Sequence, residues 1–181
     1  GRPPLRLHGP GPEGGVSDRE ELAAKLAAAV ARHLGPPGRI HGLSRLTGGA
    51  TKATFAFEAE VAGGRLPLIL QVAAPSAAAP TTATLRGASD VALMQAALRA
   101  GVPAPRVRFV LDAEDGLGEG YATDRVGGET LGRKIATSPQ FEGVRPLLAG
   151  QCGRILASIH RIEPAAVPFL KAQDAAGQRA V

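Results

Sequence analysis

Two adjacent glycines, Gly48 and Gly49, form the turn around which this 181-residue sequence is organised. They lie in the stretch 46–55, between a segment of strand composition and a second that begins with β-branched and aromatic residues. Glycine adopts positive φ at low cost and lets the backbone approach a ligand closely. Successive amide N–H groups in such a turn form a concavity that suits an anion. An ordinary hairpin turn has the same composition, so both interpretations stay open at this point.

The elements that must position this turn follow from the hydrophobic pattern. Ser17 and Glu20 form a capping box at the start of a helix that Gly35 ends. Apolar and polar residues alternate from 51 to 61, which is the period of a half-buried strand. Pro146 should kink or restart the helical segment that contains it. The predicted elements are a helix at 17–34, strands at 39–47, 51–61 and 66–72, a helix at 89–100, strands at 106–111 and 120–126, and helices at 131–136 and 139–162.

This order of elements predicts the α+β class. Three consecutive antiparallel strands, a helix and two returning strands make a lobe built on a five-stranded antiparallel sheet. The chain has no βαβ series, so a Rossmann-type sheet is not expected. Residues 1–15 are rich in Gly and Pro and are expected to form a flexible tail.

Composition excludes several classes of protein. Hydrophobic residues make up 44% of the chain, so it can build a core, but aromatic residues make up only 3%. Without aromatic stacking platforms, the net charge of +5 does not predict nucleic-acid binding. The single cysteine, Cys152, rules out an internal disulfide and a cysteine-based zinc site. No apolar run of membrane-spanning length and no signal-peptide pattern occurs, so we expect a soluble cytoplasmic protein with no membrane partner.

Five segments of the chain carry a resemblance to one known family: Leu-Thr-Gly-Gly-Ala-Thr-Lys-Ala-Thr-Phe at 46–55, Leu-Ile-Leu-Gln at 68–71, Gly-Val-Pro-Ala-Pro-Arg-Val at 101–107, Gly-Tyr-Ala-Thr-Asp-Arg-Val-Gly-Gly-Glu-Thr-Leu at 120–131 and Ile-Leu-Ala-Ser-Ile-His-Arg-Ile at 155–162. Together they resemble the kinase-like superfamily of aminoglycoside and choline kinases. The resemblance is strongest to its bacterial branch near the phosphotransferases found beside acyl-CoA dehydrogenases. It implies a protein-kinase-like N-terminal lobe at 16–126, which binds the nucleotide, and the helical start of an incomplete C-terminal lobe at 127–181.

The resemblance assigns ATP as the cofactor and gives the phosphates to the glycine turn. The backbone amides of Gly48 and Gly49, with Thr51, would contact these phosphates. The other end of the nucleotide, the adenine, would meet a hinge at the end of the last strand.

In that hinge, the backbone of Asp124 to Val126 would hydrogen-bond the adenine edge, and Thr123 would stand at the back of the adenine pocket. Leu46, Phe55 and Ile69 are candidates for the apolar walls of the same pocket. Simple core packing is the alternative for each of these three.

One position departs from the family pattern. Relatives carry a basic residue at the end of the third strand, and this chain has Gln71 there. The carboxylate that normally pairs with that base would be Asp90, which could also serve only as a helix N-terminal acid. An amide donates a hydrogen bond to phosphate without charge, which is weaker. The substitution predicts weakened nucleotide binding or a compensating base such as Lys52 or Arg86.

The catalytic loop of the superfamily is missing from these residues. It needs an aspartate in a His-Gly-Asp-type loop and an asparagine a few residues later, yet the chain has no asparagine and no His-x-Asp. We therefore assign no catalytic and no metal-binding residue. The 181 residues are expected to be an inactive N-terminal part of an enzyme that moves the ATP γ-phosphate to a small-molecule hydroxyl. Mg²⁺ is expected only with the missing C-terminal part.

Two other interpretations remain. A degenerate, non-catalytic lobe could hold a nucleotide or a partner, which Gln71 favours. A basic interaction domain without ligand rests only on the net charge. The acceptor stays open among aminoglycosides, choline-like alcohols, sugars and hydroxyacyl thioesters. An apolar helical face at 147–159 could also support a homodimer.

Overall fold

The fold is taken from a computed structural model that describes residues 16–46, 52–73 and 87–170. These residues form two compact units. The first contains the described residues up to Val91 together with Pro105–Gly127, and the second contains Ala92–Ala104 and the described residues from Gly128 onward. The division into lobes at residue 126 stays a prediction.

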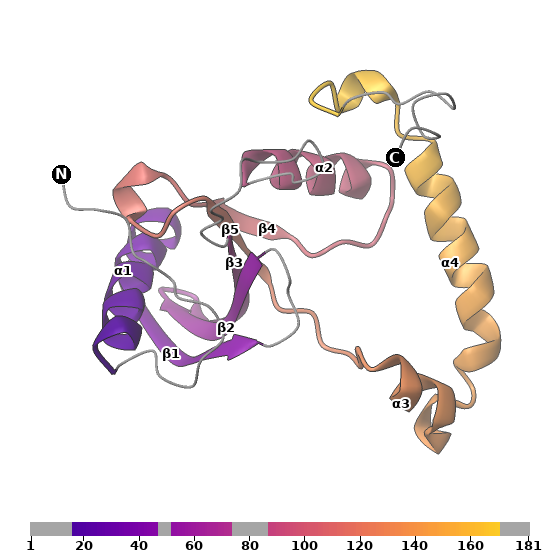
Figure 1. The fold of residues 1–181 in the computed structure, drawn as a ribbon, viewed down its shortest axis with the longest axis horizontal. Helices are drawn as coiled ribbons and strands as arrows, with labels where there is room; N and C mark the ends of the chain where they lie inside the picture. Colours follow the sequence, from indigo (N-terminus) through magenta and orange to yellow (C-terminus); the bar gives the residue numbers. More distant parts are fainter. Residues whose placement is uncertain (1–15, 47–51, 74–86, 171–181) are drawn as a thin grey trace, which may run out of the picture. The chain divides into compact units, whose positions relative to one another are not determined.

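The first unit is built on a five-stranded antiparallel sheet in the order β1-β2-β3-β5-β4 (Figure 1). This confirms the predicted α+β class and the predicted sheet. The fifth strand ends two residues earlier than the sequence pattern suggested, so its last residue is Asp124. The strands are β1 (Pro37–Leu46), β2 (Lys52–Val61), β3 (Gly64–Ala73), β4 (Val107–Val110) and β5 (Gly120–Asp124).

The helix α1 (Val16–Leu34) packs on one face of this sheet (Figure 1). Its residues Leu26 and Val30 are fully buried and share one apolar cluster with Phe57, Leu68 and Leu70 of the strands. Burying side chains of this size stabilises the fold by about 1.5–3 kcal/mol each. The apolar residues at helical spacing in α1 and the alternating apolar residues of β2 therefore pack into a single core.

The pairing register divides the strand residues between the face that α1 covers, which we call the α1 face, and the opposite face, which we call the second face. Successive side chains of a strand point to opposite faces, and paired residues of neighbouring strands point to the same one. A continuous cross-strand row on the second face takes one residue from each strand: Leu46, Thr54, Gln71, Tyr121 and Val110.

Of the three candidates for the adenine-pocket walls, Phe55 takes the alternative role of core packing. Phe55 is only 6% exposed and belongs to the apolar cluster on the α1 face. Its neighbour Thr54 takes the second face instead, because the two differ by one residue in the strand. Leu46 and Ile69 do lie on the second face, where Ile69 pairs with Ala56 and Thr123.

The remaining elements are helical. The chain passes through α2 (Ala88–Arg99), whose first turn belongs to the first unit, and the short η1 (Ala113–Asp115) between β4 and β5. The second unit continues with α3 (Gly132–Thr137), η2 (Pro139–Phe141), α4 (Arg145–His160) and η3 (Pro164–Ala166).

The helix predicted at 139–162 is interrupted. Pro146 lies in the first turn of α4, where a proline needs no hydrogen-bonded N–H, so the proline restarts the helix and does not kink it. Along α4 the side chains of Leu147, Leu156 and Ile159 are exposed. None of the helices in the described residues has the length and apolar character needed to cross a membrane.

Candidate functional site

A lysine and a carboxylate meet at one end of the second face. Lys52 is the first residue of β2, and it lies on the same face as Thr54, two residues later. Its ammonium forms an ion pair with the carboxylate of Asp90, which comes from the first turn of α2. Lys52 Nζ also lies 5.4 Å from the centre of the Tyr121 ring, within range of a cation–π contact.

Gln71 lies beside this pair, in the middle of the cross-strand row. It pairs with Thr54 on one side and with Tyr121 on the other. The Tyr121 hydroxyl donates a hydrogen bond of 2.5 Å to the Gln71 side-chain oxygen. The sequence left open which cation would stand in for the missing base at position 71, and the structure pairs Lys52 with Asp90.

The close approach of β5 to β3 at this point requires a glycine. A Cβ on Gly120 would lie 2.4 Å from the backbone oxygen of Gln71 and 3.1 Å from Cα of Val72. Any larger residue at position 120 would push the two strands apart. The Tyr121–Gln71 contact therefore depends on the residue next to Tyr121 in the chain.

The local charges hold Lys52 in its cationic form. Burial alone lowers the pKa of Lys52, but the hydrogen bond to Asp90 and the electrostatic effects of Tyr121 and Asp90 outweigh it and raise the pKa above its usual value. Burial also raises the pKa of Tyr121, and the neighbouring Lys52 only partly offsets this. Around neutral pH Lys52 is therefore an ammonium and Tyr121 a neutral phenol.

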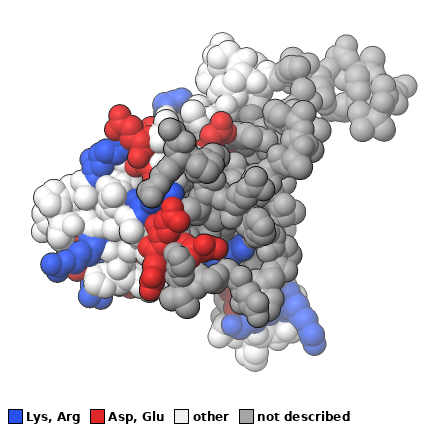
Figure 2. All heavy atoms as spheres, turned by 60° about the vertical axis from the view of Figure 1, so that its left-hand side comes forward, with Lys and Arg blue, Asp and Glu red and all other residues white. Residues whose placement is uncertain are grey.

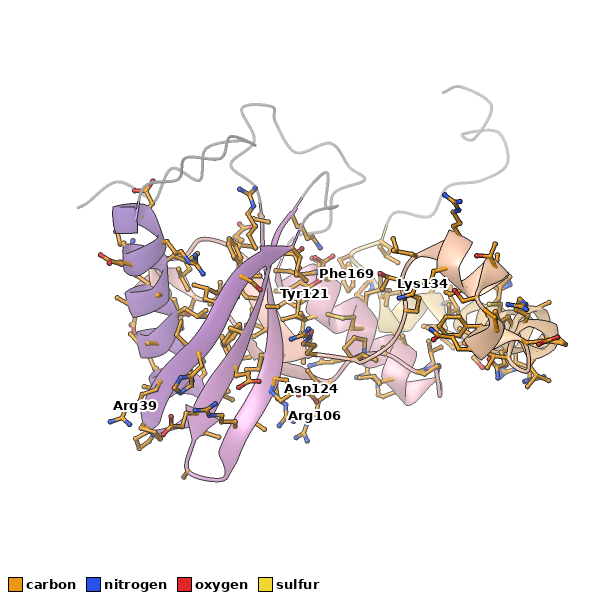
Figure 3. The ribbon with its side chains drawn as sticks, turned by 90° about the horizontal axis from the view of Figure 1, so that it is seen from below. Arg39, Arg106, Tyr121, Asp124, Lys134 and Phe169 are labelled. Atoms are coloured by element: carbon orange, nitrogen blue, oxygen red, sulfur yellow. The ribbon has the colours of Figure 1, made fainter. Side chains whose placement is uncertain are left out.

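The predicted hinge begins at Thr123, which is buried on the second face and pairs with Ile69 and Val107. The side chain of Asp124 is engaged elsewhere, because its carboxylate accepts hydrogen bonds of 2.5 and 3.2 Å from Arg108. Its N–H donates to the Arg106 carbonyl at 2.9 Å. Figure 3 labels Tyr121 and Asp124, which come from the same strand, and Arg106 beside Asp124.

The backbone beyond Asp124 leaves the sheet. Arg125 N–H donates to the Pro67 carbonyl at 2.9 Å, and Val126 is 69% exposed. Within the part of the chain that the structure describes, the Val126 N–H donates to no backbone carbonyl. This segment can therefore present its backbone groups to the edge of a ligand. The Asp124 carboxylate is not available for this, because it is paired with Arg108.

Several predicted site residues cannot be compared with the structure. Gly48, Gly49 and Thr51, predicted to contact phosphate, lie outside the described residues, as does the alternative cation Arg86. Lys52 is the first described residue after the glycine turn.

Tyr121 is the residue that the sequence analysis missed. Its place in the predicted strand at 120–126, two residues before Thr123, puts both side chains on one face. That spacing was visible in the sequence, but the partner strand and the register were not.

The described residues contain one group of three potential metal ligands, and it does not fit magnesium. His33, Asp112 and Asp115 have ligand atoms within 4.8 Å of one another. The guanidinium of Arg32 already lies among them, with Nη2 2.6 Å from Asp112 and 2.5 Å from Asp115. A cation there would face a fixed positive charge, and Mg²⁺ prefers an octahedral set of oxygen ligands. No step of a reaction is assigned to this group.

Comparison with known proteins gives one match. The model of the phosphotransferase enzyme family matches residues 43–180, which is more than half of the chain. The matched range contains the glycine turn, Lys52, Gln71, Asp90 and the hinge. A search of curated proteins and a search of solved structures each found no match.

Proposed function

The chain belongs to the phosphotransferase enzyme family, and on that basis we propose that the second face of its sheet binds ATP. The observation that carries the proposal is the cross-strand row through Thr54, Gln71 and Tyr121, with the Lys52–Asp90 pair at its end. The α1 face is apolar and filled by the core, whereas the second face gathers polar and charged side chains. A nucleotide needs both an apolar wall and charged groups for phosphate, and the second face supplies both.

The phosphate end of the ATP lies at the glycine turn in this proposal. The backbone amides at Gly48 and Gly49, with the Thr51 hydroxyl, hold the phosphates. Gln71 and Asp90 belong to the same end of the site. The sequence proximity of Lys52 to the turn and its contact with Asp90 support this arrangement.

The adenine end lies at the hinge. Thr123 closes the back of the pocket, and Ile69 and Leu46 contribute apolar surface on the same face. The Asp124 carbonyl accepts from the adenine amino group, and the Val126 N–H donates to a ring nitrogen. The exposure of Val126 supports this assignment, since a hinge must present its backbone to the ligand.

The reaction is transfer of the ATP γ-phosphate to a hydroxyl of a small molecule. Phosphoryl transfer depends on positioning and on charge neutralisation by groups and metal ions around the phosphate. These 181 residues lack the asparagine and the His-x-Asp of the family's catalytic loop, so by themselves they bind ATP without transferring phosphate. Mg²⁺-dependent hydrolysis by the purified chain, removed by Gly49→Val, contradicts this part of the proposal.

Calorimetric titration with ATP tests the binding function. We expect the chain to bind ATP and the Gly49→Val variant to lose at least about tenfold in affinity, because a side chain blocks close backbone approach. Gly63→Val is the matched control. Gly63 lies in the exposed β2–β3 turn, with no atom within 4 Å of an added Cβ. Absence of any ATP binding by the wild type at millimolar concentration refutes the proposed function.

A non-catalytic module that binds a nucleotide or a partner is the second candidate. The neutral amide of Gln71, held by Tyr121, is the observation that favours it. The two candidates differ when the full protein containing these residues is incubated with γ-labelled ATP and small-molecule hydroxyl acceptors. Label transfer establishes the enzyme, and ATP binding without transfer to any acceptor favours the module.

A further inference from the structure

Asp90 pairs with a lysine of β2, whereas the family pattern places the basic partner on the third strand. Asp90 is paired with Lys52 of β2, and both side chains are mostly buried, with 13% and 24% of their surface exposed. Residue 71 of β3 lies next to this pair on the same face, since Thr54, two residues beyond Lys52, is its cross-strand partner. The cation and its carboxylate are therefore present, but the cation comes from the neighbouring strand.

Gln71 is not able to take the cation's place. Its side chain is neutral, and its amide oxygen already accepts from the Tyr121 hydroxyl. The amide NH₂ can donate to phosphate, but a neutral donor contributes less than a charged one. Gln71 and Tyr121 form a neutral polar pair, so among the described residues the positive charge on this part of the face comes from Lys52.

Lys52 has the properties of a phosphate-binding residue. An ammonium has three donors, so pairing with Asp90 leaves it the capacity to bind an anion as well. The Tyr121 ring and Asp90 fix its position from two sides. Only two residues separate it in the chain from Gly49, and its raised pKa keeps it charged.

We propose that Lys52 of β2 is the cation that binds the ATP phosphates, in place of a basic residue at position 71 of β3. This inference rests on the proposed ATP-binding function and adds to it the identity of the charged group. Asp90 and Tyr121 are positioning residues, because they act on the phosphate through Lys52. Gln71 supplies at most a neutral hydrogen bond.

The experiment compares ATP with adenosine, which has no phosphate. Both are titrated by calorimetry into the wild type and into Lys52→Gln. We expect Lys52→Gln to weaken ATP binding about tenfold, the difference between a charged and a neutral hydrogen bond, and to leave adenosine binding unchanged. Lys25→Gln is the matched control, since it removes the same charge from α1, where Lys25 pairs with Glu21 at 2.9 Å. The control is expected to bind both ligands like the wild type.

Two further variants keep the test valid if Lys52→Gln is poorly folded. Lys52→Gln combined with Asp90→Asn removes both charges, so that no unpaired carboxylate is left half-buried. It is expected to show the same selective loss for ATP. Asp90→Asn alone keeps the ammonium of Lys52 but removes its charged partner. We expect a smaller loss of ATP affinity, relative to adenosine affinity, than in Lys52→Gln.

Moving the charge back to β3 provides the converse test. The double variant Lys52→Gln with Gln71→Lys is expected to recover ATP affinity at least several-fold over Lys52→Gln, with a steeper salt dependence than for adenosine. If the ATP affinity of the double variant does not recover, a cation at position 71 does not reach the phosphates. In that case the selective loss in Lys52→Gln still assigns the phosphate contact to Lys52.

The outcomes separate the two proposals. If the wild type binds ATP and Lys52→Gln binds it equally well, the assignment of Lys52 is wrong and the ATP-binding function stands. If Lys52→Gln weakens ATP and adenosine alike, Lys52 supports the fold and not the phosphates, and the assignment is again wrong. If the wild type binds neither ligand, the proposed function fails and the role of Lys52 fails with it.

Discussion

The two faces of the sheet each carry a charged cluster, and the clusters differ in how fully their charges are paired. At the end of α1, the Arg32 guanidinium contacts the carboxylates of Asp112, Glu114 and Asp115 at 2.5–2.8 Å. We call these residues, with His33, the Arg32 cluster. Figure 2 shows acidic and basic side chains close together on the side where α1 comes forward. On the second face, one ammonium faces one carboxylate, Lys52 with Asp90.

The Arg32 cluster is further closed by local hydrogen bonds. Asp115 Oδ2 accepts from the Asp112 N–H at 2.9 Å, and Asp112 accepts from the Glu114 N–H at 2.8 Å. His33 lies 3.1 Å from Asp115 and stacks on Phe109 with ring centres 4.9 Å apart. With so many of its groups already engaged, this cluster joins α1 to the β4–β5 turn. The Lys52 pair keeps donor capacity for an anion, and this difference supports the proposal that the second face binds a ligand.

Removing the central carboxylate of the Arg32 cluster should have the largest effect on stability. The Asp115 side chain is 1% exposed, so Asp115→Ala leaves the Asp112 N–H without its acceptor and leaves Arg32 only its two more exposed partners, Asp112 and Glu114. We expect the free energy of unfolding to fall by about 3 kcal/mol in urea denaturation. The control is Glu114→Ala, since Glu114 pairs with the same Arg32 but is 83% exposed, and it should cost less than about 0.5 kcal/mol. Equal losses in both variants contradict the central role of Asp115.

The same cluster should make the fold sensitive to acid. Hydrogen bonds from Arg32 lower the pKa of Asp112, and for Asp115 burial raises the pKa but bonds from Asp112, His33 and Arg32 outweigh it and leave it lowered. A carboxyl whose pKa is lower in the folded state stabilises fully above its usual range, and this contribution disappears as the pH falls through the folded value.

We therefore expect the free energy of unfolding to fall steeply below about pH 4. Asp115→Asn should start from a lower stability near pH 6 and lose less on acidification. The measurement is urea denaturation of both proteins between pH 2 and 7. Parallel curves for the two proteins mean that other carboxyls cause the acid sensitivity.

The sequence predicted the sheet better than it predicted the clusters. Alternation in 51–61 and the helical spacing in α1 are local patterns. The structure forms both elements because each pattern places apolar side chains in the core. The contacts of Lys52 with Asp90, and of Arg32 with Asp112, depend on strand order and register, which no local pattern contains. Phe55 shows the same limit, because a shift of one residue decides which face a side chain takes.

The position of Gln71 was inferred from the family pattern, but its surroundings were not. The resemblance placed a neutral residue where a base is usual, and it named Asp90 as the carboxylate. It offered Lys52 and Arg86 as substitutes with nothing to choose between them. The three-dimensional contacts support the proposal for Lys52, because Asp90 and the Tyr121 ring both lie against it, whereas Arg86 lies outside the described residues.

The smallest predicted effect concerns the Tyr121 hydroxyl. It tests whether a contact on the second face contributes less to the free energy of unfolding than a contact in the Arg32 cluster. Tyr121→Phe removes the bond to Gln71 but keeps the ring against Lys52. Gln71 is only half-buried, so its amide can bond to water instead, and we expect a loss of about 1 kcal/mol or less in urea denaturation. ATP affinity relative to adenosine should change by no more than about twofold in the same variant. Tyr121→Leu removes the ring as well and should lower that ratio further, because Lys52 loses one of the two groups that position it. If Tyr121→Phe destabilises the protein as much as Asp115→Ala does, the second face is as tightly built as the Arg32 cluster, and the contrast between them is wrong.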